Sequence, residues 1–478
     1  MTIGLKLVDT RRISPKAAHW AVLGLMVFEL CQYGMNQVFN WSIENPRTLA
    51  SYDFAAHRKE SLEFLRADSG GDFRVAAIDG SPWGSNGSNI WRIPAIYGWN
   101  PFLLRDYRDY LRQFTQLSDY AQPFGGPDHR LESPMLDLLG VKYLLIIQPD
   151  EEQQQLAESS KFEKVFAELD WRAIYRNKDY LSRVWFYPHS YTLRDRTQVL
   201  ALMNSRWFQA RRTLLYAEPE LTAKALPHAE PLASITLLPG QVSSASGGGV
   251  RPDTNCAEPR QFWGDWSATG AWIRFDIPSI QNPGRYVLLM EYADPYSVPP
   301  RIQAEIAQGA SKQSGTAVVL PRTYGWPCSD ARTSELGVFE LESAGTQLTL
   351  ASQENSPMNV YTLWLVRLPE ITAPGAVDFS FSNFSFSANH SSFQAELPRD
   401  GFILLNEIYY PGWEATVDGQ PAEILRADHI FRTLAVSAGS HQIEMRFRPR
   451  NFWLGATVSL LTLAGLLGFF VVQRRRFP

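Results

Sequence analysis

Aromatic side chains are the residues of this sequence whose type and placement most suggest chemistry. Four of them lie among Gly, Asp and Pro residues in one region of the chain: Trp263, Trp266, Tyr324 and Trp326. An aromatic face suits a sugar because the sugar's axial C–H groups stack on the π-system while its hydroxyls bond to polar neighbours. These four residues are therefore candidate glycan-binding residues, and structural packing of the same rings is the alternative.

Patterns that carry catalysis or bind metals are missing from the sequence. The eight histidines form no H-E-x-x-H or other close pair, and the three cysteines form no C-x-x-C. The glycines of 247–249 are not followed by the Lys-Ser/Thr of a Walker A motif, and no G-x-S-x-G elbow occurs. The residues therefore predict no metal site and no cofactor, and they identify no catalytic residue.

Two apolar segments are long enough to cross a membrane. Residues 17–39 are mostly apolar and residues 452–472 carry no charge, so each can cover about 30 Å at about 1.5 Å per residue. Basic residues precede the first segment and Arg474–Arg476 follow the second. Under the positive-inside rule both termini are cytoplasmic and the chain between them is exported. A cleaved signal peptide is the alternative for the first segment, but no A-x-A-like site follows closely.

Three polar side chains interrupt the first apolar segment. Glu29, Gln32 and Asn36 are spaced to share one face of a helix. An ionisable residue within a span usually faces protein or water, so this face predicts packing against other membrane helices, such as those of a polytopic partner. The alternative places Glu29 near the membrane interface, extended towards water or protonated.

The composition favours strands over helical bundles, because 13% of the residues are aromatic and Gly and Pro are frequent (32 and 31). A net charge of −4 argues against nucleic-acid binding. The predicted fold class is a membrane-anchored α+β protein, with an α/β domain and jelly-roll-like β-sandwich domains between two transmembrane helices. The predicted parts are a cytoplasmic tail (1–16), a transmembrane helix (17–39), an extracytoplasmic α/β domain (41–215), a linker (216–236), a β-sandwich (237–370), a C-terminal β-sandwich (371–450), a transmembrane helix (452–472) and a cytoplasmic tail (473–478).

The cysteines outside the membrane segments predict a disulfide. Cys31 lies within the first apolar segment, which leaves Cys256 and Cys328 as the exported cysteines. Two thiols within one exported sandwich tend to pair in an oxidising compartment. Two buried free thiols are the alternative.

Near the C-terminus the sequence resembles a known family. The stretch Tyr409, Tyr410, Pro411, Gly412 and Trp413 is followed by Val417-Asp418-Gly419, residues 427–431, residues 438–441 and an apolar helix. This series resembles the end of YfhO-type bacterial membrane proteins. Earlier stretches agree in order: Phe28-Glu29-Leu30, residues 97–101, residues 138–143, and the pair Tyr175-Arg176-Asn177 and Ser182-Arg183, where Ser182 replaces the usual proline.

The resemblance implies a polytopic membrane glycosyltransferase of GT-C-like architecture that takes sugar from a polyprenyl-phosphate carrier. In that architecture the catalytic acid lies in an N-terminal helical bundle, for which this sequence offers one helix, so no catalytic residue is carried over. The function expected is therefore that of the extracytoplasmic part of a YfhO-like protein, taking part in cell-envelope glycan transfer. The expected location is the bacterial cytoplasmic membrane.

The middle β region carries a second resemblance. Residues 270–278, 284–286 and 290–293 resemble strands of jelly-roll carbohydrate-binding modules. This resemblance implies glycan binding and supports the alternative function, a non-enzymatic, membrane-tethered glycan-binding or assembly module. The partners expected are the lipid bilayer, a polyprenyl-phosphate-sugar or envelope glycan, and a polytopic membrane protein.

Overall fold

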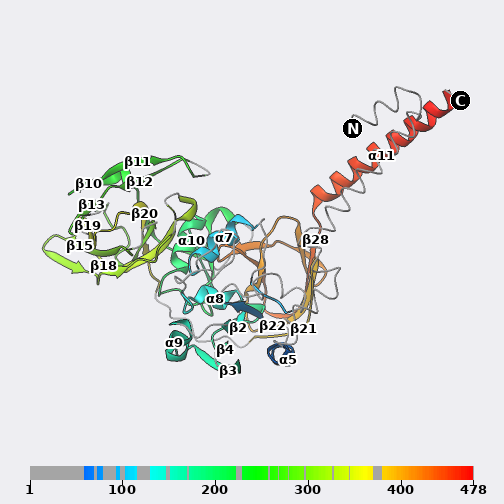
Figure 1. Cartoon of the computed structure of the whole chain (residues 1–478), viewed down its shortest axis with the longest axis horizontal. Coiled ribbons are helices and arrows are strands. Elements are labelled where there is room, and N and C mark those ends of the chain that lie inside the picture. Colours follow the sequence, from blue (N-terminus) through cyan, green and yellow to red (C-terminus); the bar gives the residue numbers. More distant parts are fainter. Residues whose placement is uncertain are drawn as a thin grey trace, which may run out of the picture. The chain divides into compact units, whose positions relative to one another are not determined.

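The computed structural model of the chain describes residues 59–68, 73–78, 93–96, 103–115, 130–146, 151–169, 172–221, 229–256, 259–266, 268–277, 279–294, 298–323, 325, 328–343, 345–369 and 379–476. The chain divides into two compact units, Met1–Ser69 and Gly70–Pro478. The helix α5 (Lys59–Ala67) is the described element of the first unit. All other described elements belong to the second unit (Figure 1).

A four-stranded sheet begins the second unit, within the region for which an α/β domain is predicted. Its order is β1 (Arg74–Ala77), β2 (Val141–Ile146), β4 (Arg172–Asn177) and β3 (Phe162–Leu169), with β1 and β2 parallel and the other pairs antiparallel. The helices of this region are α7 (Arg105–Arg112), α8 (Pro134–Leu138), α9 (Glu151–Glu158) and α10 (Arg196–Met203).

Local signals in the sequence explain where α8 and α10 begin. The hydroxyl of Ser133 caps α8 by accepting a hydrogen bond from the Met135 N–H, and Pro134 occupies the first turn, where it costs no helical hydrogen bond. Asp195 caps α10 by accepting from the N–H groups of Thr197 and Gln198. The parallel pairs β6 (Ser190–Leu193) with β7 (Leu215–Ala217) and with β8 (Ala229–Pro231) flank this helix in sequence.

The first sandwich is a jelly-roll-like pair of antiparallel sheets (Figure 1). Successive long strands alternate between the sheets, which is why apolar residues from both meet in one core. One sheet contains β10 (Val242–Ala245), β13 (Trp272–Ile277), β19 (Thr346–Ser352), β15 (Arg301–Gln308), β16 (Ser311–Ser314) and β17 (Val318–Val319). The other contains β11 (Gly249–Asp253), β12 (Arg260–Gly264), β20 (Asn359–Arg367), β14 (Gly284–Ala293), β18 (Arg332–Leu341) and β9 (Ser234–Leu237).

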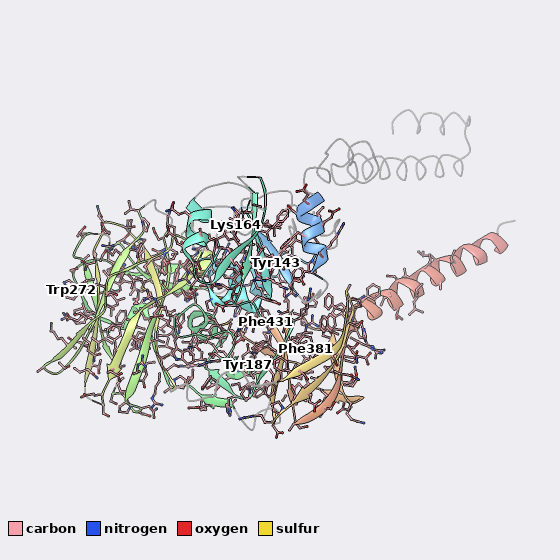
Figure 2. All side chains as sticks on the ribbon, turned by 90° about the horizontal axis from the view of Figure 1, so that it is seen from below. Tyr143, Lys164, Tyr187, Trp272, Phe381 and Phe431 are labelled. Carbon is pink, nitrogen blue, oxygen red and sulfur yellow. A yellow bond between two sulfur atoms is a disulfide. The ribbon has the colours of Figure 1, made fainter. Side chains whose placement is uncertain are left out.

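The second sandwich includes a strand from far earlier in the chain. One sheet is β21 (Ser380–Ser387), β22 (His390–Leu397), β28 (Gly439–Phe447), β24 (Trp413–Val417) and β25 (Gln420–Ala422). The other is β26 (Leu425–Ala427), β27 (Phe431–Val436), β23 (Gly401–Ile408) and β5 (Val184–Tyr187). Phe381 and Phe431 mark the two sheets in Figure 2. Residues predicted to belong to the 41–215 domain therefore complete this sandwich, while the predicted domain boundaries stay predictions.

The two-residue turn between β24 and β25 has the conformation that its sequence predicts. Val417 pairs with Gln420, and Asp418 and Gly419 between them have φ angles of 52° and 77°. Positive φ at both positions is the requirement of a type I′ hairpin turn, which Asp-Gly satisfies. The Asp-Gly sequence thus accounts for the hairpin.

The last helix is α11 (Arg450–Arg476), which coincides with the second predicted membrane segment. Within the described part of the chain, no helix combines the length and the apolar character that crossing a membrane requires. The first predicted membrane segment, with Glu29, Gln32 and Asn36, lies outside the described residues. The two transmembrane helices of the predicted fold class are therefore not part of the established fold.

Candidate functional site

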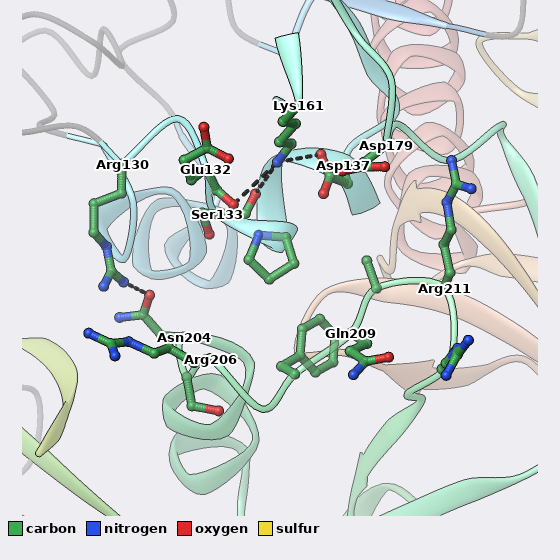
Figure 3. Close-up of a pocket in the computed structure, with 15 residues that line it drawn as sticks. Arg130, Glu132, Ser133, Asp137, Lys161, Asp179, Asn204, Arg206, Gln209 and Arg211 are labelled. Carbon is green, nitrogen blue, oxygen red and sulfur yellow. Dashed lines mark hydrogen bonds and ion pairs between the residues drawn. The ribbon is translucent and has the colours of Figure 1, made fainter. Parts of the chain in front are cut away.

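A polar cavity of about 650 Å³ is the candidate site (Figure 3). Its walls come from the loop and first turn of α8, from residues flanking the β3–β4 hairpin, and from the loop after α10. The residues lining it are Arg130, Glu132, Ser133, Pro134, Asp137, Lys161, Asp179, Asn204, Ser205, Arg206, Phe208, Gln209, Ala210, Arg211 and Arg212. Pockets of this size commonly hold small organic ligands.

A buried ion pair forms one wall of this pocket. The Nζ of Lys161 lies 2.8 Å from Oδ1 of Asp137 and donates to the carbonyls of Glu132 and Ser133 at 3.3 Å each. Asn177 donates to the same carboxylate oxygen at 2.7 Å. Burial raises the pKa of Asp137, and the charge of Lys161 opposes that rise. Because Lys161 and Asp137 use these bonds on each other and on the backbone, we assign the pair a structural role.

Arg130 forms the opposite wall and makes no ion pair with a described carboxylate, although the charge of Glu335 acts on it from a greater distance. Its Nη2 donates to Oδ1 of Asn204 and to the carbonyl of Gln113, while its buried Nε has no hydrogen-bond partner among the described residues. Burial lowers the pKa of Arg130, the nearby charge of Arg332 acts in the same direction, and the charge of Glu335 opposes both. The exposed residues of the rim are Glu132, Asp179, Arg206, Gln209, Arg211 and Arg212.

Two of the four predicted glycan-binding aromatics, Trp263 and Trp266, belong to the described residues. Trp266 is only 2% exposed and belongs to the core of the first sandwich, so its ring faces protein instead of solvent. Trp263 is partly buried against the same core, and a Cβ added at Gly248 would lie 2.6 Å from its Nε1. Tyr324 and Trp326 lie outside the described residues, and their assignment stays a prediction.

The family-motif residues form a packed turn before β24. The guanidinium carbon of Arg432 lies 3.8 Å from the centre of the Trp413 ring, and that of Arg426 lies 4.6 Å from the centre of the Tyr409 ring. Tyr410 is 47% exposed. Gly412 has φ of 106°, and a Cβ there would approach the Phe447 ring at 3.1 Å, so this position suits glycine. Pro411 precedes it on the exposed surface.

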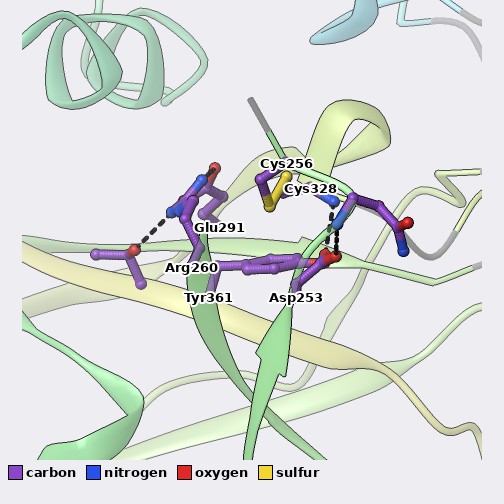
Figure 4. Close-up of a disulfide and its surroundings, with 8 residues drawn as sticks. Asp253, Cys256, Arg260, Glu291, Cys328 and Tyr361 are labelled. Carbon is purple, nitrogen blue, oxygen red and sulfur yellow. Dashed lines mark hydrogen bonds and ion pairs between the residues drawn. A yellow bond between two sulfur atoms is a disulfide. The ribbon is translucent and has the colours of Figure 1, made fainter. Parts of the chain in front are cut away.

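The predicted disulfide is present in the structure (Figure 4). Cys256 and Cys328 are bonded, with their Cα atoms 5.6 Å apart. Beside the bond, Oδ2 of Asp253 accepts hydrogen bonds from the Cys328 N–H at 3.1 Å and from the Tyr361 hydroxyl at 2.7 Å. The Asp253 carboxylate lies near both sulfurs, but sulfurs joined in a disulfide do not offer thiolate ligands to a metal.

Sequence reasoning missed the pocket because its residues form no motif. Arg130, Lys161 and Arg206 come from three separate segments that only the fold brings together. One signal was available, namely the concentration of Arg206, Arg211 and Arg212 within seven residues. That signal alone does not distinguish a pocket wall from a solvated surface.

The C-terminal region of the chain is similar to a known protein family. Residues 331–459 match the family described as "Bacterial membrane protein YfhO". The curated "Uncharacterized protein YfhO" of Bacillus subtilis (strain 168) is 30% identical over 92 residues, which cover 19% of this chain and 10% of that protein. The aligned region thus spans about a tenth of the relative.

Several solved structures resemble 28% of the chain. The C-terminal CBM6 of LamC, a marine laminarinase from Zobellia galactanivorans, is 12% identical and covered in full, with a TM-score of 0.24. A beta-1,3-glucan binding CBM6 from Bacillus halodurans is 16% identical and 96% covered, with a TM-score of 0.23. From the family match and the curated relative, the resemblance of this chain to YfhO-type bacterial membrane proteins is confirmed, with the family match lying over residues 331–459.

Proposed function

We propose that this chain is a membrane-attached, glycan-binding part of a YfhO-like protein and takes part in cell-envelope glycan transfer. The observation that carries the proposal is the polar cavity of about 650 Å³ lined by Arg, Asp, Asn and Gln side chains. These are the planar, multivalent hydrogen-bonding groups that suit the adjacent hydroxyls of a sugar ring. The transfer chemistry is assigned to other parts of the YfhO-like protein, because no residue of this chain is assigned a catalytic role.

The exposed end of the pocket can supply these hydrogen bonds without rearrangement of the fold. Gln209 and Asp179 lie on the rim and are exposed, whereas Asn204 is buried and bonded to Arg130 and to the Thr333 carbonyl at 2.7 Å. Buried groups that are already bonded give a preformed wall, and exposed groups remain able to bond a ligand. We infer that a saccharide enters from the rim formed by Asp179 and residues 206–212.

Membrane attachment is proposed from α11. The helix has 27 residues, which extend about 40 Å at about 1.5 Å per residue. Large apolar side chains along it are exposed, among them Leu460 (66%), Leu461 (68%) and Leu467 (58%). An exposed apolar surface of this kind indicates contact with lipid or with other apolar helices. We propose that α11 lies in the bacterial cytoplasmic membrane, with the domains before it outside the cell.

The glycan proposal is tested with the full-length chain in detergent micelles, first on an array of bacterial envelope saccharides and then by calorimetry with the best binder. The pocket variant combines Asp179→Ala and Gln209→Ala, both exposed. Its matched control combines Asp276→Ala and Gln347→Ala, a hydrogen-bonded Asp–Gln pair at 2.8 Å on the first sandwich. We expect at least a tenfold loss of affinity in the pocket variant and none in the control. An array without binders, or equal loss in both variants, overturns the proposal.

The attachment proposal is tested in spheroplasts carrying an affinity tag at either end of the chain. External protease should digest the region between residues 41 and 450 and spare both tags. Cleavage of a tag after residue 478 from outside contradicts the proposed orientation. In untreated membranes, release of the chain into the supernatant by alkaline extraction contradicts the attachment.

A further inference from the structure

We propose that the pocket selects saccharides that carry an oxyanion, either a carboxylate or a phosphate, and that Arg130 and Arg206 provide this selection. The inference rests on the proposed function, which assigns glycan binding to the pocket, and adds the chemical class of the glycan. Three features of the pocket support it.

The first feature is the balance of charge in the lining. Lys161 and Asp137 neutralise each other at 2.8 Å. The charged lining that remains consists of four arginines, Arg130, Arg206, Arg211 and Arg212, against two carboxylates, Glu132 and Asp179. The cavity thus presents an excess of positive charge in a protein whose overall net charge is −4. A concave, positively charged surface concentrates anionic ligands.

The second feature is the state of Arg130. Its described hydrogen bonds go to neutral oxygens, the amide of Asn204 and the carbonyl of Gln113. Its Nε is buried and has no partner within the described chain. A half-buried guanidinium that forms no ion pair, with the Glu335 charge acting only from a greater distance, is incompletely compensated. An oxyanion in the pocket would add charge-assisted hydrogen bonds to it.

The third feature is the placement of Arg206 beside Arg130. Figure 3 shows their two guanidinium groups on the same side of the pocket, next to Asn204. The Glu335 carboxylate accepts a hydrogen bond at 2.8 Å from the backbone N–H of Arg206, and no ion pair between Glu335 and the Arg206 guanidinium occurs among the described residues. Like charges brought together repel unless an anion lies between them. Two planar guanidinium groups match the geometry of a carboxylate or phosphate.

The test uses the full-length chain in micelles and two pairs of ligands that differ only in charge. Trigalacturonic acid is compared with its methyl ester, and glucose 1-phosphate is compared with glucose, each by calorimetry at 50 and 300 mM NaCl. We expect one or both acids to bind at least tenfold more tightly than the neutral partner, with weaker binding at high salt. The pair that shows the difference identifies the carboxylate or the phosphate as the source of the charge.

Arg206→Gln is the decisive variant because its side chain is exposed, so its replacement should leave the fold unchanged. We expect it to lose at least tenfold in affinity for the acid and to leave the neutral partner unchanged. Arg285→Gln on the first sandwich, where the side chain is 66% exposed, is the matched control and should change neither affinity. Arg130→Gln should act like Arg206→Gln, but because Arg130 is half-buried and bonded to Asn204 and Gln113 the decision rests on Arg206.

The two proposals fail in different ways. If acid and neutral saccharides bind equally and Arg206→Gln changes neither, the charge selection is wrong while glycan binding stands. If none of the saccharides on the array or in the calorimeter binds, the proposed function fails and this inference fails with it.

Discussion

Trp413 is held by a charged neighbour as well as by apolar packing. Its ring packs against the core of the second sandwich, contacts the Phe447 ring and lies beneath the Arg432 guanidinium. Arg432 is 3% exposed and donates from Nε to the Ile408 carbonyl at 3.1 Å. Burial lowers the pKa of Arg432 to about 10, and the Glu407 carboxylate opposes that shift. The ring and the guanidinium therefore depend on each other for their positions.

Replacing Trp413 should therefore cost more than replacing the neighbouring Tyr410. We expect Trp413→Ala to lower the free energy of unfolding by roughly 3 kcal/mol, because it opens a cavity and uncovers a buried cation. Tyr410→Ala, at a side chain 47% exposed, should cost less than about 1 kcal/mol. Thermal unfolding of the two variants checks the difference, and equal melting temperatures would contradict the packing role of Trp413.

His429 should make the second sandwich sensitive to acid. The imidazole is 8% exposed, and its Nδ1–H donates to the Arg196 carbonyl at 3.3 Å. Burial lowers the pKa of His429 to about 4, below the value of about 6.5 expected in the unfolded chain. The unfolded chain thus binds the additional proton between these values, so stability is full above pH 6.5 and falls as the pH drops towards 4.

The variant His429→Asn removes this titration and keeps a residue type that tolerates the φ of 69° at this position. Its stability should change less than that of the wild type between pH 7 and pH 4.5, where the wild type loses up to about 1.4 kcal/mol per pH unit. Melting temperatures across this range provide the measurement. His189→Asn, at an exposed residue, controls for the loss of a histidine as such. Parallel curves for His429→Asn and the wild type would show that the buried imidazole contributes nothing.

At the scale of elements, the sequence indicates individual strands and turns better than it indicates which separate segments meet in the fold. The Asp418-Gly419 turn and the strands at 272–277, 359–367 and 413–417 follow from residue type and alternation, which act over a few residues. The strand β15 alternates in exposure in the same way. The pocket could not be predicted, since Arg130, Lys161 and Arg206 meet only through the packing of separate elements.

The disulfide links two loops of the first sandwich, after β11 and at the start of the short helix Cys328–Asp330. It closes a separation of 72 residues. In the chain-entropy model such a loop contributes roughly 4 kcal/mol to stability.

We expect the double variant Cys256→Ser with Cys328→Ser to lower the melting temperature of the first sandwich, as reductant does in the wild type. Calorimetry with and without reductant checks this, and the double variant, which should not respond to reductant, is its own control. A melting temperature of the double variant equal to that of the wild type would contradict the prediction.

At the scale of the whole molecule, the second sandwich depends on residues about two hundred positions earlier. Val184 and Phe186 of β5 lie in its core, and Phe402 to Leu405 of β23 pair with Tyr187 to Val184. Two further contacts join the same regions. Asp428 donates from its backbone N–H to the Leu215 carbonyl at 2.8 Å and accepts from the Leu215 N–H at 2.9 Å, and the Tyr216 hydroxyl bonds to Thr433 at 2.7 Å.

This dependence predicts that the C-terminal sandwich cannot fold from its own residues. Losing β5 uncovers the sites of two apolar side chains, each worth about 1.5–3 kcal/mol, and leaves one edge of β23 unpaired. That loss approaches the whole stability of a small domain. A fragment of residues 379–449 should therefore unfold without cooperativity, whereas residues 172–221 fused to it through a Gly/Ser linker should give a sharp transition in near-UV circular dichroism. The same fusion carrying Val184→Asp and Phe186→Asp is the matched control and should lose the transition. A sharp transition of the 379–449 fragment alone, at the melting temperature of the fusion, would mean that the sandwich folds without β5.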